Sequence, residues 1–269
     1  MKIAIGYKLI SSSWGGGNQF ATSLVKKAKE KGYVITFDLK DRDIDIILLT
    51  DPRSYTSGVS FGSFEIIWYL LFKNKNAIVL HRINECDERK NTNHINNFLR
   101  WSNYCADYTV FISHWLKSLK IYETGKDSAV ILNGGDIKTF RDYGSPSWDG
   151  ISPLKIVTHH WSANYMKGFD VYKDLDELLT HPEWGGKIEF TYIGNLPDGF
   201  SFKKSKHITP MNGQRLGIEL SKHHLYISGS INEPAGMHHI EGILCGLPII
   251  FRNSGALPEY CSGYGIPFN

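Results

Sequence analysis

Two glutamates in the segment NEPAGMHHIEGILCGLPII, residues 232–250, have the type and spacing to bind a hydroxyl-rich anion. Pro234 is expected at an early helical position, with Gly236 leaving the first turn uncrowded. A diphosphate could then bind the helix N-terminus. At the rise of a helix, Glu233 and Glu241 would lie about 12 Å apart. Glu233 would accept hydrogen bonds from the hydroxyls of a sugar, and Glu241 from those of a ribose. A capping carboxylate plus a surface carboxylate is the alternative.

Two further stretches could contact phosphate. The glycine-rich turn SSSWGGGNQF follows the first predicted strand, and Gly16 and Gly17 would let the backbone approach a phosphate closely. It matches neither GxGxxG nor the P-loop pattern, so a turn without ligand is the alternative. Lys167, followed by Gly168, could reach a diphosphate as a compact charge; a solvated surface lysine is the alternative.

Neighbouring histidines occur as three pairs: His159 and His160, His223 and His224, and His238 and His239. Neighbours on a strand point to opposite faces, and neighbours on a helix lie about 100° apart. Neither arrangement suits one ion, so we expect no bound metal and no cofactor.

Composition indicates a globular protein. The 269 residues are 42% hydrophobic and 13% aromatic, which excludes a disordered chain. The net charge of +3 is not gathered in blocks, so we expect no nucleic acid partner, while peripheral membrane association stays open. The four cysteines are widely spaced, as is typical of free thiols in a reducing compartment. The N-terminus resembles a strand rather than a secretion signal, and we expect a cytoplasmic protein.

Short apolar runs alternate with helical patterns along the whole chain, which predicts α/β architecture with parallel sheets. Strands are expected at 2–5, 34–37, 44–49, 77–80, 108–112, 129–132, 154–160, 187–194, 224–228 and 248–251. Helices are expected near 19–31, 62–72, 94–101, 114–122, 171–179, 213–223 and in the 232–250 segment. A Gly-, Ser- and Pro-rich stretch predicts a linker at 141–152 between Rossmann-like, doubly wound domains at 1–140 and 153–269, facing each other across a cleft.

Six stretches together resemble the retaining glycosyltransferases of the GT-B fold, specifically family 4 (glycosyltransferase group 1). The segment EPAGMHHIEGILCGLPII is similar to the family signature of two glutamates separated by seven residues. The others, in chain order, are GGGNQFATSL, ADYTVFISHWLKSL, VILNGGDIKTF, MKGFDVY and LYISGSINEPAG. Their joint occurrence in the family order is far more specific than any one of them.

The resemblance implies roles for these residues. Glu233 would hold the hydroxyls of the donor sugar and Glu241 those of the ribose, beside a donor loop of Pro234, Ala235 and Gly236. Lys167 would neutralise the leaving diphosphate. In the first domain, Gly16 and Gly17 would close over the diphosphate.

The first domain would also supply an acceptor side. His81, in VLHRINECDERKN, falls where the family often has a histidine touching the donor sugar. A strand-end histidine without a ligand is the alternative. Arg82 and Asn84 would line the acceptor side.

The implied activity is transfer of a sugar from a nucleotide-diphosphate sugar to a carbohydrate or lipid-linked acceptor, with retained configuration and without metal. Such activity is typical of polysaccharide biosynthesis. The glycan or glycolipid acceptor would attack the front face of the donor, so that Glu233 orients the sugar and is no nucleophile. A catalytically impaired nucleotide-sugar-binding module, or an epimerase or phosphorylase on the same fold, is the alternative.

Two departures from the family pattern matter. Ser162 stands where the family usually has an arginine five residues before the lysine. Stabilisation of the leaving group would then fall to Lys167, to the helix N-terminus, or to a substitute such as Arg215 or Lys203. The chain ends at GYGIPFN, where the family normally continues through a last strand and a long helix. These departures predict a shortened member with looser domain closure.

Overall fold

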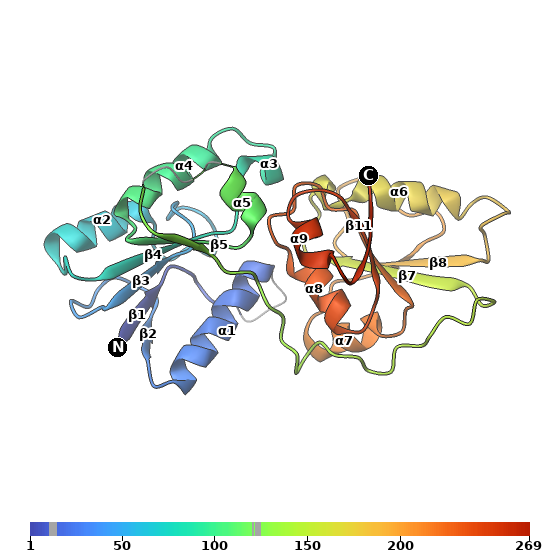
Figure 1. The fold of residues 1–269 in the computed structure, drawn as a ribbon, viewed down its shortest axis with the longest axis horizontal. Helices are drawn as coiled ribbons and strands as arrows, with labels where there is room; N and C mark the ends of the chain where they lie inside the picture. Colours follow the sequence, from blue (N-terminus) through green and yellow to red (C-terminus); the bar gives the residue numbers. More distant parts are fainter. Residues whose placement is uncertain (11–14, 120, 122–124) are drawn as a thin grey trace. The chain divides into compact units, whose positions relative to one another are not determined.

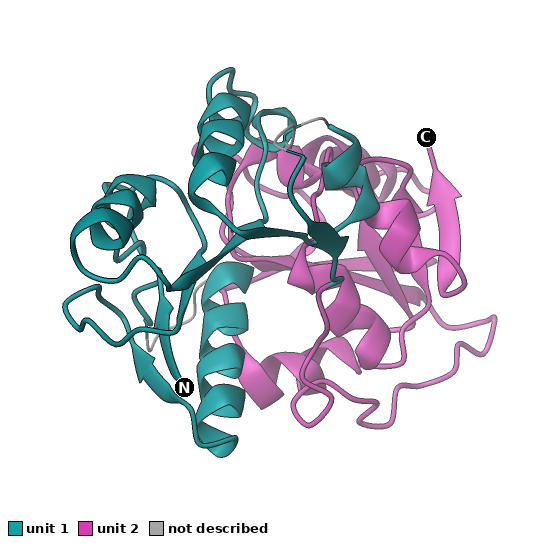
Figure 2. Ribbon diagram, turned by 60° about the vertical axis from the view of Figure 1, so that its left-hand side comes forward, with its two compact units in different colours: residues 1–132 teal, residues 133–269 magenta. Residues whose placement is uncertain are grey.

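The computed structural model describes residues 1–10, 15–119, 121 and 125–269. The chain divides into two compact units, Met1–Leu132 and Asn133–Asn269 (Figure 2). The stretch 133–152, which includes the linker expected at 141–152, is part of the second unit by its contacts. Phe140 is buried in the core of that unit, which ties the stretch to it.

Unit 1 is built on a six-stranded sheet in the order β2-β1-β3-β4-β5-β6, with every neighbouring pair parallel. The strands are β1 (Lys2–Ile5), β2 (Val34–Thr36), β3 (Ile46–Leu49), β4 (Ile78–Ile83), β5 (Tyr108–Phe111) and β6 (Ser128–Val130). The helices are α1 (Gly16–Glu30), α2 (Ser63–Phe72), α3 (Asp87–Lys90), α4 (Ile95–Ser102) and α5 (His114–Ser118), with a 3-10 turn η1 (Asn103–Cys105).

Helices cover both faces of this sheet (Figure 1). Val25 of α1 packs against Ile5 on one face, and Tyr69 of α2 packs with Ile47 and Val79 on the other. Because successive strand residues point to opposite faces, the continuous apolar strands supply both cores.

Unit 2 repeats this plan with the strand order β12-β11-β10-β7-β8-β9, again all parallel. The strands are β7 (Leu154–His160), β8 (Ile188–Gly194), β9 (Lys206–Ile208), β10 (Leu225–Ser228), β11 (Ile249–Arg252) and β12 (Gly265–Phe268). The helices are α6 (Phe169–Leu178), α7 (Gly213–Leu220), α8 (Met237–Leu244) and α9 (Leu257–Cys261), with a 3-10 turn η2 (Tyr165–Lys167).

The second sheet is also covered on both faces. Tyr172 of α6 packs with Ile156 and Tyr192 on one face. Leu216 of α7 and Leu257 of α9 pack with the core of the other face, and Figure 1 shows α6 and α7 on opposite sides of β7 and β8. The prediction of two Rossmann-like, doubly wound parallel sheets is therefore confirmed.

Several short elements were not predicted. Strand β9 has three residues with exposed Lys206 and His207, and β12 contains Gly265 and Pro267, so neither shows strand periodicity. Helix α9 has only five residues. The helix predicted at 114–122 ends at Ser118, and residues 122–124 lie outside the described residues.

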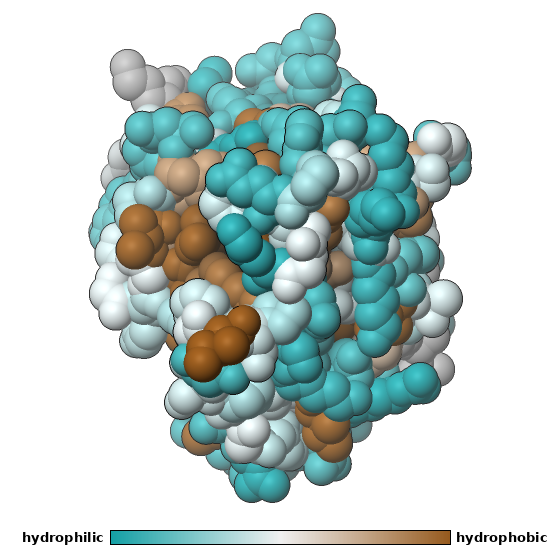
Figure 3. Space-filling view, turned by 90° about the vertical axis from the view of Figure 1, so that its right-hand side faces the viewer, coloured by the Kyte–Doolittle hydropathy of each residue, from teal (hydrophilic) through white to brown (hydrophobic). Residues whose placement is uncertain are grey.

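The face drawn in Figure 3 is largely hydrophilic, with hydrophobic side chains in separate patches. In the part of the chain that the structure describes, we find no helix with both the length and the apolar character needed to cross a bilayer.

A glycine contact sets the fit of α8 on the second sheet. A Cβ at Gly242 would overlap the buried ring of Tyr226 on β10. We expect Gly242→Ala to lower the free energy of unfolding by about 1–2 kcal/mol, because overpacking exceeds the gain in helix propensity. Urea unfolding of the full chain measures the change.

Gly134→Ala is the control, because a Cβ at Gly134 meets open space. Equal unfolding midpoints for the two variants would contradict the assigned contact.

Candidate functional site

Two loops of unit 2 bring a lysine and a glutamate together. Lys167 ends the 3-10 turn after β7, and Glu233 lies in the loop after β10. The Lys167 Nζ and Glu233 Oε2 atoms are 2.9 Å apart, and the two side chains are only 16% and 4% exposed. Their charges therefore interact with little screening by water. In a parallel sheet, ligands bind at this carboxyl edge of the strands.

The two loops touch through their backbones. Gly168 has a φ of +102°, which favours glycine, and a Cβ there would overlap the backbone of Gly229. The Ile231 N–H donates to the Met166 carbonyl at 2.9 Å. The glycine after Lys167 is thus required for the close approach that positions the lysine.

The loop after β11 holds Glu233 from another direction. The Ala256 N–H donates to the Glu233 carbonyl at 2.8 Å, and Gly255, with a φ of +62°, lies directly against the Glu233 backbone. Asn232 also has a positive φ, of 48°, and its N–H donates to the Ser254 hydroxyl at 2.9 Å. The backbone of Glu233 is therefore fixed by two neighbouring loops.

Helix α8 begins later than the sequence predicted. Its N-cap is Gly236, so Pro234 and Ala235 precede the helix, and the prediction that Pro234 occupies an early helical position is wrong. The spacing of about 12 Å expected for Glu233 and Glu241 assumed a continuous helix between them, which the structure does not have, so that spacing stays a prediction without this basis. The Ala235 carbonyl accepts a hydrogen bond from Asn133 Nδ2 at 3.0 Å.

The start of α8 is suited to an anion. No side chain of the described residues caps it, because its N-cap is a glycine. A Cβ at Gly236 would overlap the His238 ring and lie 3.1 Å from the Glu233 carboxyl carbon. Glycine thus keeps the first turn open, where unpaired N–H groups favour a negative ligand.

Glu241 is buried on α8 beside a histidine. Its Oε2 lies 2.7 Å from His159 Nε2, and the Tyr226 hydroxyl lies 3.1 Å from His159 Nδ1. Within the described part of the chain, Glu241 Oε1 has no hydrogen-bond partner. Burial raises the pKa of Tyr226 well above its ordinary value, so this hydroxyl keeps its proton.

His160, His238 and His239 of unit 2 are buried close together, with ring centroids 4.4 Å apart for His160 and His238 and 4.9 Å apart for His238 and His239. His160 points to the face opposite His159, with its Nε2 2.8 Å from the Tyr172 hydroxyl, as the strand argument predicted. His238 Nε2 lies 3.0 Å from the Ser228 hydroxyl, and neither ring nitrogen of His239 finds a described partner. Burial lowers the pKa of His239 to about 4 and that of His238 well below its usual range. Among described residues, no three His, Cys, Asp or Glu side chains could hold a metal.

The predicted glycine loop of unit 1 is described only in part. Gly16 and Gly17 form the first residues of α1, and Gly15 is its N-cap. Residues 11–14 of the loop lie outside the described residues. A Cβ at Gly17 would be 3.4 Å from the Tyr7 hydroxyl. The contact of these glycines with a diphosphate stays a prediction.

The acceptor-side candidates differ in placement. His81 is fully buried on β4, with its Nδ1 2.7 Å from Asn103 Oδ1, and burial lowers its pKa to about 4. The next residue, Arg82, stacks over Phe20 at 3.7 Å on the α1 face. Asn84 follows the strand and is half-buried. The neighbours on β4 thus face different sides of the sheet, and their ligand roles stay predictions.

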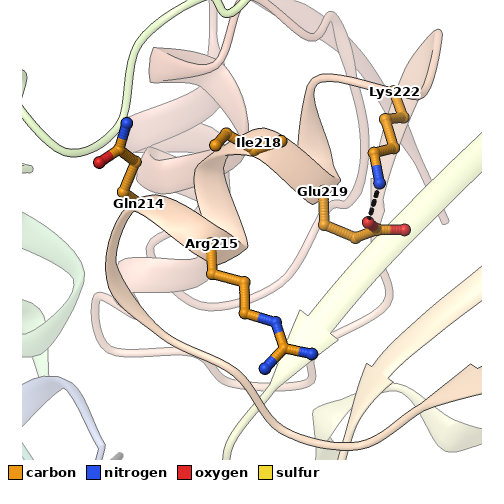
Figure 4. A pocket seen from close by; sticks show the side chains of 5 residues that line it. All are labelled: Gln214, Arg215, Ile218, Glu219 and Lys222. Carbon is orange, nitrogen blue, oxygen red and sulfur yellow. Dashed lines mark hydrogen bonds and ion pairs between the residues drawn. The ribbon is translucent and has the colours of Figure 1, made fainter.

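The proposed substitutes for the missing arginine are on the surface. Lys203 Nζ pairs with the Glu177 carboxylate, both exposed. Arg215 lines an open groove on α7 with Gln214, Ile218, Glu219 and Lys222 (Figure 4). The Ser162 hydroxyl accepts a hydrogen bond from the Asn164 N–H at 3.2 Å, so this loop is closed on itself.

Sequence reasoning missed the partner of Glu241. His159 was weighed only as a metal ligand, and Tyr226 was not weighed at all. The available signal was strand parity: His159 shares a face with Val157, which packs in the core that includes Tyr226.

The buried histidines predict acid lability. His81 and His239 have pKa values lowered by burial from 6.5 to about 4. The unfolded chain takes up protons below pH 6.5 while the folded units do not, so unfolding free energy falls between pH 6.5 and 4 and is insensitive to these groups above pH 6.5. Each histidine accounts for a loss of up to about 3 kcal/mol in unfolding free energy as the pH falls from 6.5 to 4. Urea unfolding at a series of pH values measures this loss.

The matched variants are His81→Gln and His239→Gln, which should each flatten the pH dependence. His181→Gln, at an exposed position, should leave it unchanged. An unaltered slope in both buried variants would exclude these histidines as the cause.

Comparisons with known proteins identify the fold. No family model matches the chain, and no curated protein matches it. It is similar to sucrose-phosphate synthase from Thermosynechococcus elongatus, with a TM-score of 0.68, 13% identity and coverage of 99% of this chain and 85% of the other. The comparison with the apo form of the lipopolysaccharide outer core galactosyltransferase WaaB gives a TM-score of 0.69 at 13% identity, with coverage of 100% of this chain and 86% of the other. The catalytic domain of starch synthase IV from Arabidopsis thaliana, bound to ADP and acarbose, gives a TM-score of 0.65 at 12% identity, with coverage of 96% of this chain and 84% of the other. The chain therefore has the GT-B fold of these enzymes.

Proposed function

We propose that this protein is a retaining glycosyltransferase that moves a sugar from a nucleotide-diphosphate sugar to a carbohydrate or lipid-linked acceptor without a metal ion. The observation that carries the proposal is the ion pair of half-buried Lys167 and buried Glu233, in the loops near the uncapped start of α8. The fold shared with a galactosyltransferase and with a starch synthase that binds ADP and acarbose supports the same interpretation. The cytoplasmic location and a membrane-associated acceptor stay predictions.

The diphosphate part of the donor would bind at α8. The first-turn N–H groups and the helix dipole favour a negative ligand, and the Lys167 ammonium supplies a full positive charge. As the bond between the sugar and the diphosphate breaks, negative charge grows on the leaving group. Preorganised donors stabilise that charge most strongly where water is excluded, and the Lys167 side chain is only 16% exposed.

Glu233 would orient the sugar. Its carboxylate oxygens can accept hydroxyl hydrogen bonds, and its backbone is fixed by two loops. In front-face transfer, the acceptor oxygen forms a bond to the anomeric carbon as the bond to the diphosphate breaks. The acceptor's proton goes to a phosphate oxygen of the donor. Glu233 forms no covalent bond in this scheme.

The remaining residues complete the proposed site. Glu241 would accept a ribose hydroxyl, and Gly16 and Gly17 would contact the diphosphate. His81, Arg82 and Asn84 are proposed for the acceptor side, although His81 would have to become accessible from its buried position. The ADP and acarbose bound to the starch synthase are a nucleoside diphosphate and a saccharide ligand, the two ligand classes proposed here.

A binding module with impaired catalysis is the second candidate. The observation that favours it is Ser162, an uncharged residue whose hydroxyl accepts from the next turn, in place of a cation. One phosphate contact fewer would slow departure of the leaving group more than it weakens donor binding. Release of nucleoside diphosphate in the presence of acceptor separates this candidate from an active transferase.

Nucleotide binding is the first test. We expect UDP, ADP or GDP, or a sugar derivative of one of them, to raise the melting temperature, because a ligand that binds only the folded form stabilises it. A panel of these nucleotides measured by thermal shift, with and without EDTA, identifies the base and checks metal independence. No shift with any nucleotide would remove the proposed donor site.

A double-mutant cycle tests the ion pair. Lys167→Met leaves the Glu233 carboxylate buried without its cation, so we expect a loss of about 3–5 kcal/mol in unfolding free energy. Adding Glu233→Gln should restore most of it, since no uncompensated charge remains. Turnover should fall at least about 100-fold in both variants, because the leaving-group charge lacks a preorganised partner. Urea unfolding and diphosphate release measure the two effects.

Lys27→Ala is the matched control, because the Lys27–Glu30 pair on α1 is exposed and should contribute little. Full turnover in the stable double variant would rule out Lys167 and Glu233 as catalytic residues.

A further inference from the structure

We propose that His159, held by Tyr226, is a positioning residue for Glu241: it occupies one carboxylate oxygen and leaves the other to a hydroxyl of the bound nucleotide. This inference rests on the proposed function, and it concerns the residue that prepares the site rather than the ligand contact itself. Nothing in the family resemblance assigns a role to His159 or Tyr226.

The contacts form a chain across three elements. His159 lies near the carboxyl end of β7, Tyr226 lies on the neighbouring strand β10, and Glu241 lies on α8. His159 Nε2 is 2.7 Å from Glu241 Oε2, and the two side chains are 9% and 4% exposed. A hydrogen bond to a buried carboxylate is among the stronger ones that a protein makes.

The hydrogen-bond distances favour one tautomer of His159. The Tyr226 hydroxyl accepts from the His159 backbone N–H at 3.2 Å, so its own proton is free to be donated. Its nearer acceptor is His159 Nδ1 at 3.1 Å rather than the His159 carbonyl at 3.4 Å. With Nδ1 accepting, the ring proton is on Nε2 and is donated to Glu241 Oε2. Because burial raises the pKa of Tyr226, this donor is present throughout the physiological range.

The two oxygens of Glu241 are thereby made different. Oε2 has a donor, whereas Oε1 is buried and has no hydrogen-bond partner among the residues that the structure describes. A buried carboxylate oxygen without a donor is unfavourable, so a ligand hydroxyl that supplies one would bind with a gain in affinity. A ligand that lacks the hydroxyl would leave Glu241 Oε1 without a hydrogen-bond donor. The ratio of the affinities for the two ligands therefore measures how well His159 positions Glu241.

Tyr226 has a second part in this arrangement. Its ring lies against Gly242, the residue after Glu241, and so sets how closely α8 approaches the sheet. The same side chain thus influences both the distance of Glu241 from the sheet and the ring nitrogen of His159 that carries the proton. Removing only the hydroxyl separates these effects, because the ring contact with Gly242 remains.

The experiment compares nucleotides with and without ribose hydroxyls. The probes are UDP, ADP and GDP and their 2′,3′-dideoxy forms, with dissociation constants measured by calorimetry. For the nucleotide that binds wild-type protein best, we expect the ribose form to bind about tenfold or more tightly. His159→Leu should bring that ratio close to one and raise KM for the donor with a smaller change in kcat. His159→Gln, which keeps an N–H donor, should recover part of the ratio.

His223→Leu is the matched control, because His223 is equally buried and its Nδ1 bonds to backbone carbonyls at the end of α7. It should leave the ratio unchanged. If His159→Leu does not fold, Tyr226→Phe provides the test, since loss of the donor to Nδ1 should reduce the ratio severalfold while the ring packing remains.

The outcomes separate the two proposals. Wild-type protein that binds nucleotide while His159→Leu and Tyr226→Phe keep the full ratio would overturn the positioning role and leave the proposed function standing. Wild-type protein that binds none of the three nucleotides would overturn both. A collapse of the ratio in folded His159→Leu, with partial rescue by His159→Gln, supports the role.

Discussion

The ion pair of half-buried Lys167 and buried Glu233 constrains how the loops after β7, β10 and β11 meet in unit 2. Two opposite charges taken out of water are tolerated only when each is held in place against the other. The structure meets that requirement through the backbone: Gly168 lies against Gly229, and Gly255 lies against Glu233. Because glycine has no side chain, the loops after β7, β10 and β11 can approach one another closely at these positions.

A second carboxylate on the same helix is held by different chemistry. Glu241 has a histidine in place of a lysine, and this histidine has a phenol behind it. The imidazole lies 2.7 Å from one carboxylate oxygen and so fixes the orientation of the Glu241 side chain. The two glutamates therefore lie in different surroundings, one beside a lysine ammonium and one beside an imidazole ring. The parity of β7 makes this possible, because it sends His159 towards α8 and His160 towards α6.

Much of the architecture could be predicted from the sequence, because parallel strands buried on both faces read as continuous apolar runs. Strand β1 was predicted at its observed bounds, and β7 likewise. Strands β9 and β12 escaped because short edge strands carry no periodic signal. The start of α8 was misplaced because proline is common in the first helical turn, yet here Pro234 belongs to the loop that carries Glu233. Contacts between distant residues, such as His159 with Glu241, depend on which strands become neighbours, and no local pattern reveals that.

The ring of Tyr226 acts as a spacer between helix and sheet. Its thickness, matched by the absence of a side chain at Gly242, fixes the level at which α8 runs. A side chain added at position 242 would require a smaller residue at position 226, and replacing the tyrosine would also remove the hydroxyl that lies 3.1 Å from His159 Nδ1. A change in the spacing of α8 from the sheet is therefore coupled to a change in the hydrogen bonds of His159.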